Sequence, residues 1–328
     1  MATRSIRVIF EFLPRVVATM NRAPRALRSG LLCAAIFLLT GMCESEPVAD
    51  SLSLTEKLAY TTVRIEVISD RGRGTGTGFF FLLLQHDSIS VPVIVTNKHV
   101  VHGAVRGSFI LTGANPDGTP NSHLVRAIHL DGFEALWTPH PDTLIDLAVM
   151  PIARLLRQAR AEGFRPFFTS LGKGTIPSED QLSQLTAVEE ILMVGYPTGI
   201  WDRVNNCPVF RRGITATHPA NKYEGRDEFM IDAACFPGSS GSPVFLYNLG
   251  SYEGRNGGTV MGTRFFFLGV LYAGPQYTAT GEIRILTIPE RRDTVTTTSI
   301  PLNLGNVIRS SRILDFEPVF SAPNEGDH

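Results

Sequence analysis

Short apolar runs separated by turn residues fill the chain from about Leu54 onward. The runs are rich in β-branched and aromatic residues, and clusters of Gly, Pro, Asn and Asp, such as 115–118 and 254–258, lie between them. Strand-length runs bounded by turn clusters predict an antiparallel β-barrel or sandwich rather than a parallel α/β sheet. The predicted strands include 61–68, 78–84, 91–96, 147–152, 191–195, 230–233 and 265–271.

Two segments in the middle of the chain have helical patterns instead. Four apolar residues fall on one face of a helix over 152–162. Ser178 and Gln181 have the spacing of a capping box, which predicts the start of a shorter helix. A third segment, 304–314, has two apolar residues four positions apart, and we expect it to form a closing helix.

The order of these elements predicts the domain organisation. The two middle helices lie between two β-rich halves, so we expect them to link two β-barrels. The final dozen residues, which end in Asn324-Glu325-Gly326-Asp327-His328, predict a flexible tail. The expected ranges are one domain at 50–316, with barrel one at about 55–152, the linker at 153–187 and barrel two at about 188–300, and then the tail at 317–328.

The N-terminus has the layout of a secretory signal peptide. Three arginines precede an apolar run at 31–42, which is too short for a membrane-spanning helix of about 20 residues. We therefore assign 1–45 to an N-terminal extension and signal peptide. The residues before Met20 leave two explanations, a true start at Met20 or an extended signal. A buried apolar helix of the mature fold is the alternative to export.

The cysteines bear on processing and on the mature domain. Cys43 is a candidate for lipidation, although Met42 precedes it where a small residue is usual, and cleavage after Ser45 is the alternative. Export would make the protein periplasmic or extracellular, with membrane attachment only through a lipid on Cys43. Cys207 and Cys235 then remain, either as one disulfide or as two free thiols. Neither has a partner at ligand spacing, so no metal site is expected.

Composition excludes some classes of function. The chain is 43% apolar and 19% charged, with a formal net charge of −1. There is no basic excess and no Lys/Arg-rich run, so we expect no nucleic-acid partner.

A histidine follows one of the predicted strands. His99 comes just after the apolar run 93–95, in a turn from which a side chain can face a cleft. A lone histidine at such a place is often structural, so it gains meaning only from its companions. Competing histidines are His102, His140 and His218.

An aspartate opens another predicted strand. Asp146 precedes the run 147–152, which would place its carboxylate at the edge of a barrel. Burying a carboxylate costs free energy unless a strong donor such as an imidazole N–H faces it. The alternative is a turn or capping aspartate, a role that Asp142 suits better.

A run of small residues, 238–242, lies between two predicted strands. Such residues let the backbone turn tightly and point successive N–H groups one way, as an oxyanion hole requires. In this interpretation Ser240 is the nucleophile, and the N–H groups of Gly238 and Ser240 are the donors. The alternative is a simple Gly/Ser turn. A strand-to-helix nucleophile elbow is excluded, because position 242 is Ser and the residues after it predict a strand.

Together these segments resemble the chymotrypsin-like (trypsin-like) serine peptidases. They are most similar to the protease domain of the bacterial high-temperature-requirement (HtrA/Deg-type) branch. The similarity covers roughly 60–275 and appears in the order expected for that branch. The matching segments are Gly76-Thr77-Gly78-Phe79-Phe80, Thr96-Asn97-Lys98-His99-Val100, Asp146-Leu147-Ala148-Val149, 191–197 and 232–243.

The resemblance implies an all-β fold of two six-stranded antiparallel Greek-key barrels, with connecting helices and a C-terminal helix. It also implies a His99–Asp146–Ser240 triad that cleaves peptide bonds in protein or peptide substrates without a cofactor. Ser239 and Ser242 depart from the Asn or Asp and the Gly usual at these places. No PDZ-type domain is expected after the second barrel. Because Ser239 cannot form the salt bridge that an aspartate makes in zymogen-activated relatives, we expect activity without N-terminal processing of that kind.

The resemblance also implies the position of the specificity pocket. It places Ala234 where a trypsin-type enzyme has an acidic residue, which predicts a preference for small or medium apolar side chains over Lys or Arg. The pocket residues are expected to be Ala234, Phe236, Tyr272 and Gly274. Two alternatives to a peptidase stay open, a protease-like binding protein that has lost catalysis and an esterase that uses the same site. The oligomeric state stays open as well.

Overall fold

The computed structural model describes residues 6–8, 52–86, 89–274, 276–283 and 294–321. The candidate start at Met20 and the candidate lipidation site at Cys43 lie outside the described residues, as does the predicted signal peptide apart from a three-residue strand. Among the described helices, none is both long enough and apolar enough to cross a membrane.

The first lobe is a ten-stranded sheet that wraps around its own core. Its main path runs β1-β6-β5-β2-β3-β4-β8-β7, while β9 pairs with β5 and β10 with β3. Pairing along the path from β6 to β7 is antiparallel throughout. The strands are β1 (Ile6–Val8), β2 (Thr62–Ser69), β3 (Gly72–His86), β4 (Ile89–Thr96), β5 (Ala104–Ala114), β6 (Pro120–Asp131), β7 (Thr138–Pro139), β8 (Ala148–Pro151), β9 (Pro166–Phe167) and β10 (Leu171–Gly172).

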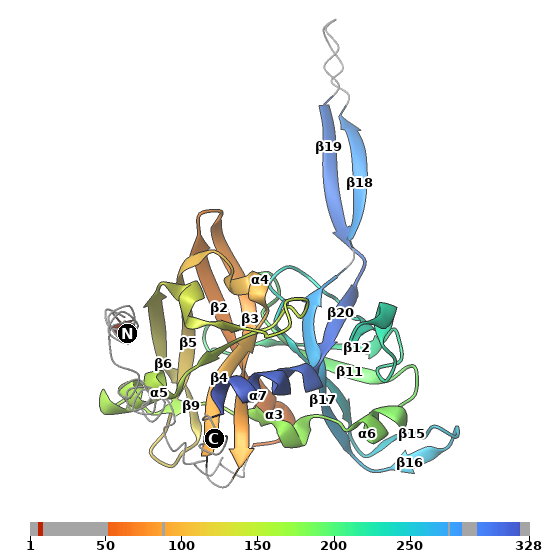
Figure 1. Ribbon diagram of the computed structural model, residues 1–328, viewed down its shortest axis with the longest axis horizontal. Helices are drawn as coiled ribbons and strands as arrows, with labels where there is room; N and C mark the ends of the chain where they lie inside the picture. The colour runs from red at the N-terminus through yellow and green to blue at the C-terminus, as the bar shows by residue number, and fades with distance from the viewer. Residues whose placement is uncertain (1–5, 9–51, 87–88, 275, 284–293, 322–328) are drawn as a thin grey trace, which may run out of the picture.

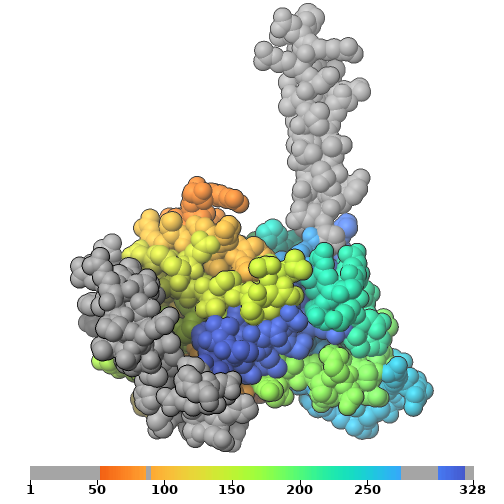
Figure 2. Space-filling model, in the orientation of Figure 1, coloured from red at the N-terminus to blue at the C-terminus, as the bar shows by residue number. Residues whose placement is uncertain are grey.

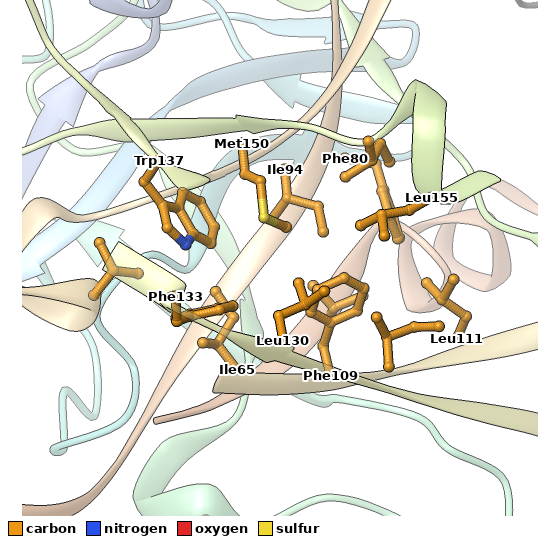
Figure 3. Packing of buried hydrophobic residues seen from close by; sticks show 14 of the residues in the cluster. Ile65, Phe80, Ile94, Phe109, Leu111, Leu130, Phe133, Trp137, Met150 and Leu155 are labelled. Atoms are coloured by element: carbon orange, nitrogen blue, oxygen red, sulfur yellow. The ribbon is translucent and has the colours of Figure 1, made fainter. Parts of the chain in front are cut away.

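The aromatic run on β3 shows how the sheet divides two cores. Phe80 points into the core of the first lobe, which is packed with branched aliphatic and aromatic side chains (Figure 3). Phe79 and Phe81 point to the opposite face and contact Phe267 of the second barrel. The strand is therefore buried on both faces, which explains its continuous apolar sequence.

The second lobe is a closed six-stranded antiparallel barrel, in the order β11-β12-β13-β20-β17-β14. Its strands are β11 (Glu190–Gly195), β12 (Val209–Thr215), β13 (Glu228–Asp232), β14 (Pro243–Asn248), β17 (Arg264–Ala273) and β20 (Leu304–Arg309). A small hairpin, β15 (Ser251–Glu253) and β16 (Thr259–Met261), joins β14 to β17. A longer ribbon, β18 (Gln276–Ile283) and β19 (Thr294–Pro301), stands away from the barrel (Figure 1).

The two predicted linker helices are confirmed. One buries its predicted apolar face, and the other begins with the predicted Ser178–Gln181 capping box. The α-helices are α3 (Leu54–Ala59), α4 (Lys98–Val101), α5 (Ala153–Ala161), α6 (Glu179–Ser183) and α7 (Glu317–Phe320). The 3-10 helices are η1 (Phe133–Leu136), η2 (Lys173–Thr175), η3 (Pro197–Gly199), η4 (Tyr223–Gly225) and η5 (Ser310–Phe316).

The prediction of a helix over 304–314 is wrong in its first half. Leu304–Arg309 is strand β20, which pairs with β13 and β17 and closes the barrel. Two long-range ladders outweigh a local apolar spacing, because without β20 the facing backbone groups of β13 and β17 would lose their partners. The second barrel therefore extends beyond 300. The closing helices come later, as η5 and α7, so 317–320 are helical rather than part of a tail.

These features define a mostly β, two-lobe fold with connecting and C-terminal helices, the chymotrypsin-like two-barrel architecture. In Figure 1 the two lobes lie side by side, and the dark-blue C-terminal helices cross from the second lobe to the first, where Glu317 of α7 accepts the N–H of Leu84.

Candidate active site

Two neighbouring strands bring His99 and Asp146 together. β4 pairs antiparallel with β8, and Thr96 lies opposite Ala148. His99 follows the end of β4 and Asp146 precedes the start of β8, so both residues lie at the same edge of the sheet. Nδ1 of His99 lies 2.5 Å from Oδ2 of Asp146, and the His99 backbone N–H donates to Oδ1 at 3.1 Å. The carboxylate therefore holds both the ring and the backbone of His99.

The other predicted candidates have structural roles in the described chain. His102 pairs with Glu134, and His218 Nε2 lies 3.1 Å from the carbonyl of Leu185. His140 is buried and contacts the C-terminal segment. Asp142 accepts the N–H of Leu144 at 3.0 Å and so shapes a turn, as its alternative role predicted.

The loop around Ser240 presents two unused backbone donors. The N–H groups of Ser239, Gly241 and Ser242 donate to the carbonyls of Phe236, Leu271 and Ser239 at 3.0, 2.8 and 3.0 Å. Within the described part of the chain, the N–H groups of Gly238 and Ser240 donate to no acceptor. These are the two donors predicted for an oxyanion hole. Gly238 has φ +85°, a conformation that favours glycine.

The Ser240 hydroxyl is not hydrogen-bonded to His99 among the described residues. Its oxygen lies 3.5 Å from the carbonyl of Tyr272. The fold therefore joins His99 and Asp146 directly, while Ser240 is oriented toward the strand β17.

Thr77 on β3 holds the Ser240 loop, a role that sequence reasoning missed. Its N–H donates to the carbonyl of Ser240 at 2.9 Å, and its hydroxyl donates to the carbonyl of Gly238 at 3.1 Å. The same hydroxyl accepts the N–H of Tyr196 at 3.1 Å. The available signal was a threonine between two glycines just before the apolar run of the strand, Gly76-Thr77-Gly78.

The two unusual serines of the loop both fit. Ser242 is buried, and its hydroxyl lies 3.3 Å from that of Thr77. The Ser242 side chain has room because residue 195 is a glycine. A Cβ at position 195 would overlap the Ser242 hydroxyl. Ser239 is also buried, and its hydroxyl has no hydrogen-bond partner among the described residues.

The four residues predicted to form the specificity pocket differ from one another in burial and in contacts. Ala234 is half-buried, and Gly274 approaches the carbonyl of Leu304 so closely that a Cβ would lie 2.7 Å from it. Tyr272 donates its hydroxyl to the buried Glu228 at 2.8 Å, and burial together with this bond raises the pKa of Tyr272. Phe236 is exposed and packs against the guanidinium of Arg211.

The two cysteines of the domain are free thiols, so the disulfide alternative is excluded. Cys235 lies beside Gly274 and Gly305. Burial raises the pKa of Cys235 to about 11 and also raises the pKa of Cys207.

The two-lobe fold is that of the chymotrypsin-like peptidases. Residues 76–251 match the family model of the trypsin-like peptidase domain, and this range includes His99, Asp146 and Ser240. The match covers more than half of the chain, and the chain belongs to this family.

Solved structures with a similar fold include several serine proteases. The HtrA-type protease AlgW with a tripeptide has a TM-score of 0.40 and 16% identity, with 79% of this chain and 60% of that chain covered. A serine endoprotease from Yersinia pestis has a TM-score of 0.41 and 16% identity, with 80% and 63% covered. A protease from M. tuberculosis in its active form has a TM-score of 0.39 and 13% identity, with 84% and 87% covered. The chain thus spans less than two thirds of the length of the first two of these proteins. A search of curated proteins finds no match.

Proposed function

We propose that the chain is a serine endopeptidase in which Ser240 attacks the peptide carbonyl. The observation that carries this proposal is the His99–Asp146 couple, 2.5 Å apart, on a fold whose serine loop leaves two backbone N–H groups unused. Membership of the trypsin-like peptidase family supports a peptidase activity. We propose in addition that Ser240 is the nucleophile, that it forms a triad with His99 and Asp146, and that the reaction passes through a covalent intermediate.

The steps follow from these groups. The Ser240 hydroxyl first turns from the Tyr272 carbonyl toward His99, a rotation about one side-chain torsion. His99 Nε2 takes the hydroxyl proton as Oγ attacks the carbonyl, while Asp146 holds the ring and stabilises its positive charge. The N–H groups of Gly238 and Ser240 stabilise the oxyanion. The intermediate then collapses to an acyl-enzyme as His99 gives its proton to the leaving amine, and water, activated by His99, releases the acid product.

The substrate preference is proposed from Ala234. A small, half-buried apolar residue at this position offers no charge for a lysine or arginine side chain. We therefore propose that the residue before the scissile bond is small or medium and apolar.

We also propose that the protein is exported and that it needs no zymogen-type processing. The arginine-led apolar run near the N-terminus supports secretion to a periplasmic or extracellular space, with a lipid on Cys43 as an alternative to free release. Activity without zymogen-type processing is proposed because Ser239 has no charge with which to bind a new N-terminus.

A fluorophosphonate probe tests the proposal. We expect folded wild-type protein to be labelled at Ser240, and Ser240→Ala to abolish the label. Ser239→Ala is the matched control, because it removes a neighbouring buried hydroxyl and should leave labelling intact. A proteome-derived peptide library then reports the preferred residue before the cleaved bond.

The outcomes separate the candidate functions. Folded wild-type protein that takes no label would support a binding protein that has lost catalysis. Hydrolysis of short esters without peptide cleavage would support an esterase. Dominant cleavage after Lys or Arg would contradict the role of Ala234.

A further inference from the structure

The loop that carries Asp146 is clamped at its far end by the C-terminal segment. The N–H of His140 donates to the carbonyl of Leu147 at 2.9 Å, which closes residues 140–147 into a compact loop before β8. η5 packs against this loop, and Figure 2 shows the dark-blue C-terminal segment lying against the yellow-green surface of the first lobe. The position of Asp146 therefore depends on a segment more than 160 residues away in the sequence.

His140 joins the loop to η5 from within. Its side chain is fully buried, and its ring packs edge-on against Phe316 with the centroids 5.1 Å apart. Nε2 lies 3.0 Å from the carbonyl of Arg312 and 3.2 Å from Oδ2 of Asp315. Because a carbonyl only accepts, Nε2 carries a proton. The Asp142 N–H donates to Nδ1 at 3.0 Å, which joins the ring to the loop.

Arg312 joins three segments around one guanidinium. Nη2 lies 3.3 Å from Oδ2 of Asp142 in the loop and 3.0 Å from Oδ2 of Asp315 in η5. Nη1 lies 3.6 Å from Oδ2 of Asp227, which immediately precedes β13 of the second barrel. Three-quarters of the Arg312 side chain is covered, so these interactions are only partly screened by water. Arg312 thus ties the Asp146 loop to the second barrel as well as to the C-terminal segment.

The near end of the loop is held from the side of His99. The Asn97 side-chain amide donates to the carbonyl of Asp146 at 2.8 Å, and Lys98 donates to the carbonyl of Thr143 at 2.7 Å. These contacts tether the loop to the turn that carries His99. His140 and Arg312 tether the same loop to the C-terminal segment. A carboxylate that binds both the ring and the backbone of His99 needs restraint from both sides.

We propose that His140 and Arg312 are positioning residues, which hold Asp146 in register with His99 by anchoring its loop to η5 and to the second barrel. The inference rests on the proposed function, in which Asp146 orients His99. Loss of either anchor lets the carboxylate drift while the peptide-binding surfaces around Ala234 and Tyr272 stay in place. A misplacement of about 1 Å in a catalytic geometry can cost about 100-fold in rate. The loss should appear in kcat, with KM unchanged.

The test compares His140→Leu, His140→Asn and Arg312→Ala in the full chain. We expect His140→Leu and Arg312→Ala to lower kcat and the rate of fluorophosphonate labelling by about 10- to 100-fold. His140→Asn should recover most of the loss, because its amide still reaches the Asp142 backbone. His218→Leu is the matched control, since His218 also bonds a backbone carbonyl but lies on a different loop. It should lower stability while the labelling rate stays unchanged.

A second readout does not need a reactive serine. The proton between His99 Nδ1 and Asp146, whose heavy atoms are 2.5 Å apart, should give a far-downfield proton resonance in the wild type. We expect this signal to broaden or vanish in His140→Leu and to persist in His140→Asn and His218→Leu. Folded His140→Leu and Arg312→Ala proteins with wild-type resonance and labelling rate would overturn the inference. Wild-type protein that shows the resonance but takes no label would count against the proposed function, and the resonance would still decide the role of His140. If His140→Leu fails to fold, Arg312→Ala decides by the same readouts.

Discussion

Thr77→Val is the sharpest test of how the first lobe supports the Ser240 loop. Thr77 is fully buried, and the substitution exchanges a hydroxyl for a methyl group of nearly the same size. It removes the donor to the Gly238 carbonyl and the acceptor for the Tyr196 N–H, each at 3.1 Å. It also removes the hydroxyl that lies 3.3 Å from that of Ser242. The shape of the site is kept, so any effect comes from the lost hydrogen bonds.

The magnitude follows from the three groups that lose this partner, the Gly238 carbonyl, the Tyr196 N–H and the Ser242 hydroxyl. Each buried, unpaired polar group costs about 1–3 kcal/mol, so Thr77→Val should lower the free energy of unfolding by at least about 3 kcal/mol. In a domain of this size each kcal/mol lowers Tm by about 2–4 °C, which predicts a fall of at least about 6 °C. Removing one oxyanion donor outright costs about 100- to 1000-fold in kcat, and a loosened Gly238 should cost about tenfold.

Thermal unfolding and the fluorophosphonate labelling rate measure the two effects. Thr77→Ser is the control, because it keeps the hydroxyl and loses only a methyl group, so its labelling rate should stay close to that of the wild type. The reasoning is refuted if Thr77→Val unfolds within about 2 °C of the wild type and is labelled at the same rate.

Two further predictions concern the same barrel. With the pKa of Cys235 raised to about 11, only about one thiol in 1000 is ionised at pH 8, so iodoacetamide should modify it about 100-fold more slowly than an ordinary thiol. The rate should rise about tenfold per pH unit toward pH 11, as measured by mass spectrometry, and rapid modification at pH 8 would contradict the burial of the thiol. Replacing the ribbon 276–301 with a short Gly/Asn turn should leave Tm within a few degrees and labelling unchanged, because β18 and β19 pair only with each other among the described strands and Gly274 already adjoins Leu304. Loss of folding or labelling in that variant would show that the ribbon supports β17.

Local features of the sequence predicted much of the fold. The strand runs and turn clusters predicted the β-rich halves, since alternation and turn chemistry depend on neighbouring residues alone. The capping box at Ser178 predicted α6 for the same reason. The order of the three motifs predicted the peptidase family, because motif order survives in a sequence without knowledge of any contact.

Local reasoning was wrong, or lacked the physical reason, where partners are distant in the sequence. Residues 304–309 have an apolar spacing that suits a helix, yet pairing with β13 and β17 makes them a strand. The room for Ser242 depends on the missing side chain of Gly195, which lies on a different strand. Neither fact can be read from local spacing.

The sequence by itself determined which residues were available for chemistry, namely His99 after one strand, Asp146 before another and Ser240 in a loop of small residues. Only the tertiary structure decided how they are held. Pairing of β4 with β8 brings Asp146 to His99, Thr77 supports the Ser240 loop from the other lobe, and the C-terminal segment anchors the Asp146 loop. The physical reason is that a hydrogen bond or ion pair depends on distances of a few ångströms, and long-range strand pairing sets those distances.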